Sequence, residues 1–179
     1  MTDTPEAMAE IVAHHRIRKL LAALARGEDR RDGAIISDCF WPDATVDFGI
    51  FAGSFDEYLS WVVPGADSIP VTLHTLGQSL IQLRGGSAAA ETHVTAYHRI
   101  DFGEADHDVM LVGRYLDRLE QRDGQWRIAR REMMYEWTRD LGVSVDWSQG
   151  LMGMPFLHDR AIGVAKGDWS RAFFGDAGS

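Results

Sequence analysis

The chain has 179 residues, of which 45% are hydrophobic and 25% charged, and this size and composition predict a single globular domain with a sizeable core. Its formal net charge of −9 disfavours nucleic acid and anionic membrane surfaces as partners, because both are themselves negative. No apolar run could span a bilayer, the first residues lack a secretory signal, and the single cysteine, Cys39, cannot form an internal disulfide, so we expect a cytoplasmic protein.

Three helices are predicted in the first third of the chain. The first begins at Thr4, where a capping hydroxyl precedes a proline and a glutamate, and its apolar residues recur every three or four positions until near Gly27. A second, short helix is expected over about residues 30–40, where Trp41-Pro42 would stop it. A capping-box pattern at residues 54–57 opens a third helix, which ends near Pro64-Gly65.

After Pro70 the sequence changes to long runs of β type, which we expect to form strands. Turn-forming residues separate these runs, and Asp123-Gly124 between the last two is a strong hairpin signal. Helices followed by a meander predict an α+β fold, in which the helices pack on one face of a curved antiparallel sheet. The four runs cover residues 71–84, 88–102, 109–121 and 125–138.

The C-terminal segment fits neither pattern. We expect residues 1–140 to form the domain and residues 141–179 to form an extension, which still carries large apolar side chains, among them Trp147, Phe156, Leu157, Trp169, Phe173 and Phe174. That much apolar surface is unusual in a solvated tail, so the extension is expected to cover a pocket or a subunit interface.

Two histidines, His74 and His98, lie within the predicted strands. Residues 88–101 alternate regularly, and the even-numbered positions, which are small or apolar apart from His98, are expected to face the core. An inward imidazole titrates near neutral pH and needs either a hydrogen-bond partner or a functional use. The alternation around His74 is mixed, so periodicity alone does not decide which way it points.

Five short motifs in this order resemble those of the SnoaL-like branch of the nuclear transport factor 2-like superfamily, over roughly residues 8–140. Within it, the chain is most similar to the scytalone dehydratases and the hexachlorocyclohexane dehydrochlorinase group. The resemblance implies a cone of curved antiparallel sheet wrapped around N-terminal helices, a pocket at its open end, no cofactor, and assembly as a homodimer or homotrimer. The motifs are ARGEDRRD at 25–32, FWPDATV at 40–46, LHTLG at 73–77, YHR at 97–99 and RDGQWRI at 122–128.

The resemblance also implies roles for individual residues. Asp29 matches the buried aspartate that pairs with a catalytic histidine, and His74 matches that histidine. His98 matches the second pocket histidine of the scytalone dehydratases, and Tyr115 falls where that family has a polar pocket residue. Arg131 matches a pocket arginine of some dehydrochlorinases.

Three positions depart from the dehydratase pattern. Phe48 stands where that family has a water-holding tyrosine, Glu28 replaces another tyrosine beside the aspartate, and Gly113 replaces a pocket serine. These departures argue against scytalone itself as the substrate. Phe48 is grouped with His98, Tyr115 and Arg131 as a substrate-binding residue.

The chemistry expected of this set is proton abstraction by His74, oriented by Asp29, with His98 or Tyr115 stabilising the oxyanion or protonating the leaving group. Each assignment has a structural alternative. Asp29 could simply cap the second helix, and either histidine could be a core residue bonded to a backbone carbonyl. Tyr115 could be only a wall of the pocket.

The sequence does not decide which of two neighbouring arginines faces the pocket. A two-residue turn at Asp123-Gly124 pairs Leu119 with Ile128 and directs Arg130 inward, whereas the resemblance favours Arg131, which requires a bulge in the last strand. One of the two is expected to pair with a carboxylate or a substrate anion.

The sequence therefore favours one function and leaves a second open. The first is a cofactor-independent lyase or isomerase, of dehydratase or dehydrochlorinase type, that uses Asp29 and His74 on a hydrophobic small molecule. The second is a non-catalytic ligand-binding protein or an accessory assembly subunit of the same fold. No metal is expected, because no motif with metal-ligand spacing occurs in the sequence.

Overall fold

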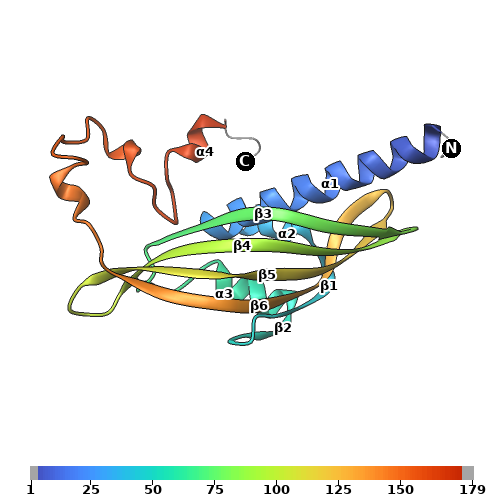
Figure 1. The fold of residues 1–179 in the computed structure, drawn as a ribbon, viewed down its shortest axis with the longest axis horizontal. Helices are drawn as coiled ribbons and strands as arrows, with labels where there is room; N and C mark the ends of the chain where they lie inside the picture. The colour runs from blue at the N-terminus through green and yellow to red at the C-terminus, as the bar shows by residue number, and fades with distance from the viewer. Residues whose placement is uncertain (1–3, 175–179) are drawn as a thin grey trace.

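The computed structural model describes residues 4–174, and these confirm the α+β fold: helices pack on one face of a six-stranded sheet with the order β2-β1-β6-β5-β4-β3 (Figure 1). The helices are α1 (Thr4–Asp29), α2 (Gly33–Cys39), α3 (Phe55–Val62) and α4 (Ser170–Phe173). The strands are β1 (Phe40–Asp47), β2 (Ala52–Ser54), β3 (Val71–Arg84), β4 (Ser87–Asp101), β5 (Asp106–Arg122) and β6 (Gln125–Val143). Two short 3-10 turns, η1 (Trp147–Gln149) and η2 (Asp159–Ala161), follow β6.

Strands β1 and β2 were not among the predicted elements. The second predicted helix ends at Cys39 rather than near Phe40, and the chain then enters β1, which pairs in parallel with β6. The sheet is therefore mixed rather than wholly antiparallel. Strand β1 was not predicted because it contains Pro42, and prolines are uncommon in strands. Pro42 lies between Phe40 and Thr45, where the β1–β6 ladder is irregular, so the missing N–H of the proline is tolerated there.

The last turn of α1 has a specific C-terminal cap. The N–H of Arg31 donates to the carbonyl of Glu28 and the N–H of Asp32 donates to that of Gly27, which is the Schellman pattern. Arg31 takes the left-handed φ of 48° that this cap requires, and its guanidinium donates to the carbonyls of Pro64, Ala66 and Ile69. The end of α1 is thereby tied to the loop that follows α3.

A bulge in β6 decides which arginine faces inward. The hairpin turns through Asp123 and Gly124, both with positive φ, and pairs Leu119 with Ile128 as predicted. The next pair is Arg118 with Arg130, so one residue of β6 is unpaired at this point. The extra residue shifts the alternation and buries Arg131, while the Arg130 side chain is 60% exposed.

A second bulge explains the mixed alternation around His74. Leu76 pairs with Val94, but the next pair is Ser79 with Thr92, so β3 contains one residue more than β4 in this stretch. Side chains before the bulge face inward at even positions, which include His74, and those after it face inward at odd positions, such as Ile81. In β4 the regular alternation buries Ala88 through Ala96 at even positions, as predicted.

The core lies between the helices and the inner face of the sheet. Each fully buried aliphatic side chain contributes roughly 1.5–3 kcal/mol to this packing. Among the described helices, none is both long enough and apolar enough to cross a bilayer. The largest fully buried apolar side chains are Ile17, Leu24, Ile36, Phe40, Tyr58, Val94, Leu119 and Ile128.

Beyond β6, the chain leaves the sheet and returns so that α4 lies near the C-terminal end of α1 (Figure 1). The N–H of Ala165 donates to the carbonyl of Pro70, and Ala165 is buried there. Leu157 and Phe173 remain largely exposed. Residues 175–179 of the expected extension lie outside the described residues.

Candidate functional site

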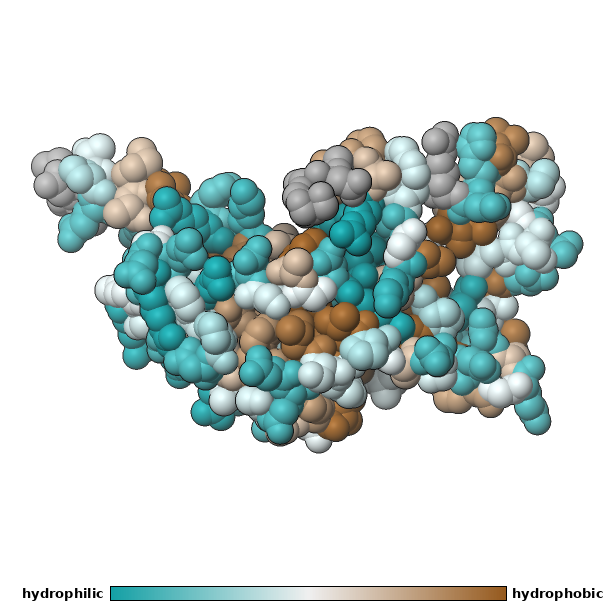
Figure 2. Space-filling view, turned by 180° about the vertical axis from the view of Figure 1, so that it is seen from behind, coloured by the Kyte–Doolittle hydropathy of each residue, from teal (hydrophilic) through white to brown (hydrophobic). Residues whose placement is uncertain are grey.

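A cavity of about 250 Å³ lies between the inner face of the sheet and the helices. Its wall is rich in aromatic side chains, namely Phe48, Tyr58, Trp61, Tyr115 and Tyr135, while Glu28, Thr72, His74 and His98 supply polar groups. Figure 2, seen from the side opposite to Figure 1, shows hydrophobic residues gathered in the middle of this face with hydrophilic residues around them. Such a composition suits an apolar small molecule that is oriented by a few polar contacts.

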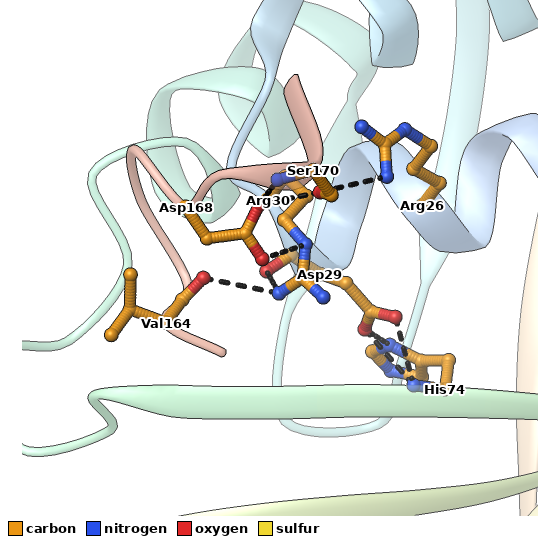
Figure 3. Close-up of polar contacts among 7 residues, drawn as sticks. All are labelled: Arg26, Asp29, Arg30, His74, Val164, Asp168 and Ser170. Carbon is orange, nitrogen blue, oxygen red and sulfur yellow. Dashed lines mark hydrogen bonds and ion pairs between the residues drawn. The ribbon is translucent and has the colours of Figure 1, made fainter. Parts of the chain in front are cut away.

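His74 lines the cavity, and Asp29, which is not itself a lining residue, is hydrogen-bonded to it (Figure 3). The Asp29 carboxylate accepts from His74 Nδ1, with Oδ1 at 2.7 Å, and from the backbone N–H of His74 at 2.9 and 3.2 Å. A carboxylate only accepts hydrogen bonds, so Nδ1 carries a proton and Nε2 is the ring nitrogen left to act as a base. Both side chains are largely buried, with 8% of Asp29 and 13% of His74 exposed.

The cap of α2 is a different aspartate. Asp32 is the N-cap residue, and its carboxylate accepts from the backbone N–H groups of Ala34 and Ile35. Asp29 is the last residue of α1 and makes none of these bonds. The structural alternative for Asp29, that it caps the second helix, is therefore wrong.

Burial and the Asp29 pair act on His74 in opposite directions. Burial by itself would lower the pKa of His74, because it disfavours the imidazolium, but the hydrogen bond to Asp29 and the charges of Glu28 and Asp29 outweigh it. The net effect raises the pKa of His74 above its ordinary value of 6.5. The raised pKa makes the neutral imidazole of His74 a stronger base.

This direction predicts the pH dependence of the site. His74 accepts a proton only in its neutral form, so the kcat/KM of a reaction in which His74 is the base should rise with pH through an apparent pKa above 6.5 and then level off. The Asp29→Asn change removes the interaction that raises the pKa, so the titration of His74 should move to lower pH. NMR titration of the His74 ring in both proteins measures this shift without a substrate, and a wild-type pKa at or below 6.5 would contradict it.

His98 and Tyr115 face the same cavity as His74. The ring centroids of His74 and His98 are 6.0 Å apart, and those of His74 and Tyr115 are 6.5 Å apart. Burial, with a smaller effect from the charge of His74, lowers the pKa of His98 to about 4, so His98 is neutral near pH 7. Burial raises the pKa of Tyr115 well above 10, so its hydroxyl keeps its proton.

Arg131 lies beside the cavity, but its guanidinium pairs with carboxylates of the protein itself. Its guanidinium makes a two-pronged pair with Asp117, with Nε–Oδ1 at 2.8 Å and Nη2–Oδ2 at 3.0 Å. Nη1 lies 3.6 Å from Glu28 Oε1, and the guanidinium carbon is 4.1 Å from the centre of the Tyr115 ring. Of the two expected partners, a carboxylate or a substrate anion, the structure gives Arg131 the carboxylate, while Arg130 pairs at the surface with Glu132.

Phe48 forms part of the aromatic wall. Its ring stacks on Tyr58 at a centroid distance of 5.4 Å and meets the edge of Tyr115 at 6.3 Å. These contacts place Phe48 on the cavity surface and fix the orientation of its ring. Sequence analysis missed Tyr58 and Thr72 as cavity residues and noted Glu28 only as a departure from a family pattern. The position of Glu28, next to Asp29 at the end of a helix, was the one available signal.

The returning C-terminal segment packs behind the Asp29–His74 pair (Figure 3). Arg30, which follows Asp29, forms an ion pair with Asp168 at 3.0 Å and donates to the carbonyl of Val164 at 3.1 Å. Arg26 donates to the hydroxyl of Ser170 at 3.2 Å. Within residues 4–174, none of the lining residues of the cavity comes from the part of the chain after β6, so the described segment supports the end of α1 rather than the cavity wall.

No three histidine, cysteine, aspartate or glutamate side chains within the described part of the chain are arranged to bind a metal ion. Two polar residues that line the cavity are each hydrogen-bonded to a neighbour, His74 to Asp29 and Glu28 to Tyr58. This arrangement can transfer protons and can accept hydrogen bonds from a bound molecule.

The helices, the curved sheet and the cavity between them form an α+β domain with room for a small molecule. Residues 9–132 match the SnoaL-like domain family, and the chain belongs to that family. No functionally curated protein matches the sequence.

Several solved structures share the fold. A putative scytalone dehydratase from Novosphingobium aromaticivorans is 22% identical, with a TM-score of 0.66 over 77% of this chain and 93% of that chain. Hexachlorocyclohexane dehydrochlorinase LinA-type3 from Novosphingobium barchaimii is 15% identical, with a TM-score of 0.68 over 85% and 99% of the two chains. A protein of unknown function from Mycobacterium tuberculosis is 24% identical, with a TM-score of 0.61 over 76% and 77%. At these identities the likeness establishes the shared fold.

Proposed function

We propose that the protein is a cofactor-independent lyase or isomerase, of dehydratase or dehydrochlorinase type, acting on a hydrophobic cyclic or aromatic small molecule. The observation that carries this proposal is His74 in the wall of an aromatic cavity, hydrogen-bonded to the carboxylate of Asp29 with Nδ1 and Oδ1 2.7 Å apart. A carboxylate that holds one nitrogen of a largely buried histidine fixes its tautomer and stabilises the imidazolium that forms during proton transfer.

In the elimination reaction, His74 Nε2 takes a proton from a carbon that a neighbouring group makes acidic. The electron pair of the C–H bond becomes the new C=C bond, and the bond from the adjacent carbon to the leaving group breaks. Halide leaves as the anion, whereas hydroxide leaves as water after it receives a proton. His98, neutral near pH 7, and Tyr115 are the groups that line the cavity and can stabilise the charge or supply that proton.

The dehydratase and dehydrochlorinase names among the fold relatives favour elimination over other proton transfers. Isomerisation uses the same first step, because the proton taken by His74 is returned at a different carbon. The wall is largely apolar, and the Arg131 guanidinium is already paired with Asp117. Both features favour a substrate that has no phosphate or carboxylate at the end of the cavity beside Arg131.

The test begins with the molecules that co-purify with the protein, identified by mass spectrometry. These molecules, and cyclic ketones with a hydroxyl or halide on the β carbon, are then incubated with the protein. We expect a product that has lost water or hydrogen halide, or an isomer of the starting compound, with the wild type and not with His74→Ala. Ligands that bind to the cavity but return unchanged from the wild type would instead support a non-catalytic binding protein.

A further inference from the structure

Glu28 has one carboxylate oxygen that no described residue uses. The side chain is 5% exposed and lines the cavity. Its Oε1 accepts the hydroxyl of Tyr58 at 2.5 Å and lies 3.6 Å from Arg131 Nη1. Its Oε2 is buried and has no hydrogen-bond partner among the described residues. A buried carboxylate oxygen without a partner is costly and rare, so its presence in a residue that lines the cavity points to a use by a bound molecule.

The surroundings of Glu28 fix which oxygen is free. Tyr58 keeps its proton, because burial, reinforced by Glu28, raises its pKa well above 10, so it donates to Oε1. Arg131 also lies on the Oε1 side and is itself held by Asp117. Rotation of the carboxylate is therefore opposed by two donors. Oε2 remains as a pure acceptor in a wall that is largely aromatic and aliphatic.

We propose that Glu28 is a specificity-determining residue, whose Oε2 accepts a hydrogen bond from a hydroxyl group of an uncharged aromatic or cyclic substrate. This inference rests on the proposed use of the cavity as the substrate site. An anionic group at this place would be repelled by the carboxylate, and an ether or hydrocarbon at this place would leave Oε2 unpaired. The bond would also set the orientation in which the substrate meets His74, since both residues line the same cavity.

The cavity volume indicates suitable probes. A cavity of about 150 Å³ lined by apolar side chains holds benzene, so about 250 Å³ accommodates a bicyclic aromatic molecule. We choose 2-naphthol, which has a hydroxyl donor, 2-methoxynaphthalene, which has the same rings without a donor, and 2-naphthoate, which carries a negative charge. Equilibrium dissociation constants are measured by calorimetry for the wild type and for the Glu28→Gln variant.

The Glu28→Gln change reverses the hydrogen-bonding character of the free position. Because Tyr58 and Arg131 are both donors, the glutamine oxygen must take the place of Oε1, and its NH2 group takes the place of Oε2. We expect the wild type to bind 2-naphthol at least about tenfold more tightly than the other two probes, as for a hydrogen bond to a charged acceptor. In Glu28→Gln this preference should fall to about twofold or less.

The control variant is Glu132→Gln, which removes the same charge from the outer surface, where Glu132 pairs with Arg130. It should keep the wild-type preference. Equal binding of 2-naphthol and 2-methoxynaphthalene by the wild type, no binding of 2-naphthol, or an unchanged preference in Glu28→Gln would each overturn the inference. Binding is measured without turnover, so a protein that shows this preference but lacks elimination activity would overturn the proposed reaction alone.

Discussion

Replacement of His74 by alanine should lower kcat/KM for the elimination by about 10²–10⁴-fold, the range that a general base contributes, and should leave the protein folded. Replacement of Asp29 by asparagine should have an effect of similar size. The asparagine NH2 group would face Nδ1 and favour the tautomer in which Nε2 carries the proton, and that form cannot act as a base.

Folding and catalysis can be separated in these variants. In Asp29→Asn, with the NH2 group facing Nδ1, the asparagine oxygen takes the place of Oδ2, which lies 3.2 Å from the backbone nitrogen of His74 in the wild type, so this hydrogen bond and the local structure should persist. Circular dichroism and thermal unfolding of each variant check this point. Activity is measured with the substrate found among the co-purified molecules or the hydroxy and halo ketones.

The matched control is His93→Ala. His93 lies on the outer face of β4, and 49% of its side chain is exposed, so its removal should leave kcat/KM within about twofold of the wild type. Turnover by both His74→Ala and Asp29→Asn at wild-type rates would eliminate the proposed mechanism. A loss of activity in His93→Ala of the same size would show that the effect is not specific to the cavity.

Replacement of Arg131 by methionine should lower the free energy of unfolding by about 3–5 kcal/mol, the usual cost of breaking a buried ion pair. The change leaves Asp117 and Glu28 as buried carboxylates without their shared cation, since Asp117 and Arg131 are each 2% exposed. It also removes the guanidinium from the face of the Tyr115 ring. Urea denaturation followed by circular dichroism measures the difference.

Arg130→Met is the matched control, because the two arginines are neighbours on β6 and differ in which face of the strand they occupy. The Arg130 side chain is 60% exposed, so the change should cost no more than about 0.5 kcal/mol. The double variant Arg131→Met, Asp117→Leu should recover much of the loss, because it also removes the carboxylate left unpaired. Equal destabilisation by Arg130→Met and Arg131→Met would contradict the register described for this hairpin.

Sequence reasoning succeeded where the signals were local. The capping box at Ser54 and Glu57 is present as predicted, and the turn at Asp123-Gly124 pairs Leu119 with Ile128. The four long strands begin near their predicted starts, but β6 continues to Val143, past its predicted end at residue 138. The C-terminal end of α1 differs by two residues, because Gly27 does not terminate the helix. The left-handed residue of the cap is Arg31, a position where glycine is more usual and where sequence offered no cue.

Sequence reasoning failed where a single extra residue changes the phase of a strand. The bulges in β3 and β6 reverse the alternation of side chains, and the only local cue is Gly77 within the first of them. Before each bulge one set of alternate positions, even or odd, faces inward, and after it the other set does. This is why periodicity left the direction of His74 undecided and left Arg130 and Arg131 as alternatives.

The amino-acid sequence by itself determined the first three helices, the four long strands with their hairpins and the inward direction of His98, because these follow from periodicity and turn chemistry within a few residues. Only the tertiary structure decided that Asp29 meets His74 across 45 positions of the chain, that Arg131 is bound to Asp117, and that Glu28 lines the cavity and has a buried oxygen without a partner among the described residues. The physical reason is that each of these contacts joins two elements whose relative position depends on a bulge or a helix cap, and the strength of a buried polar contact depends on the groups that enclose it.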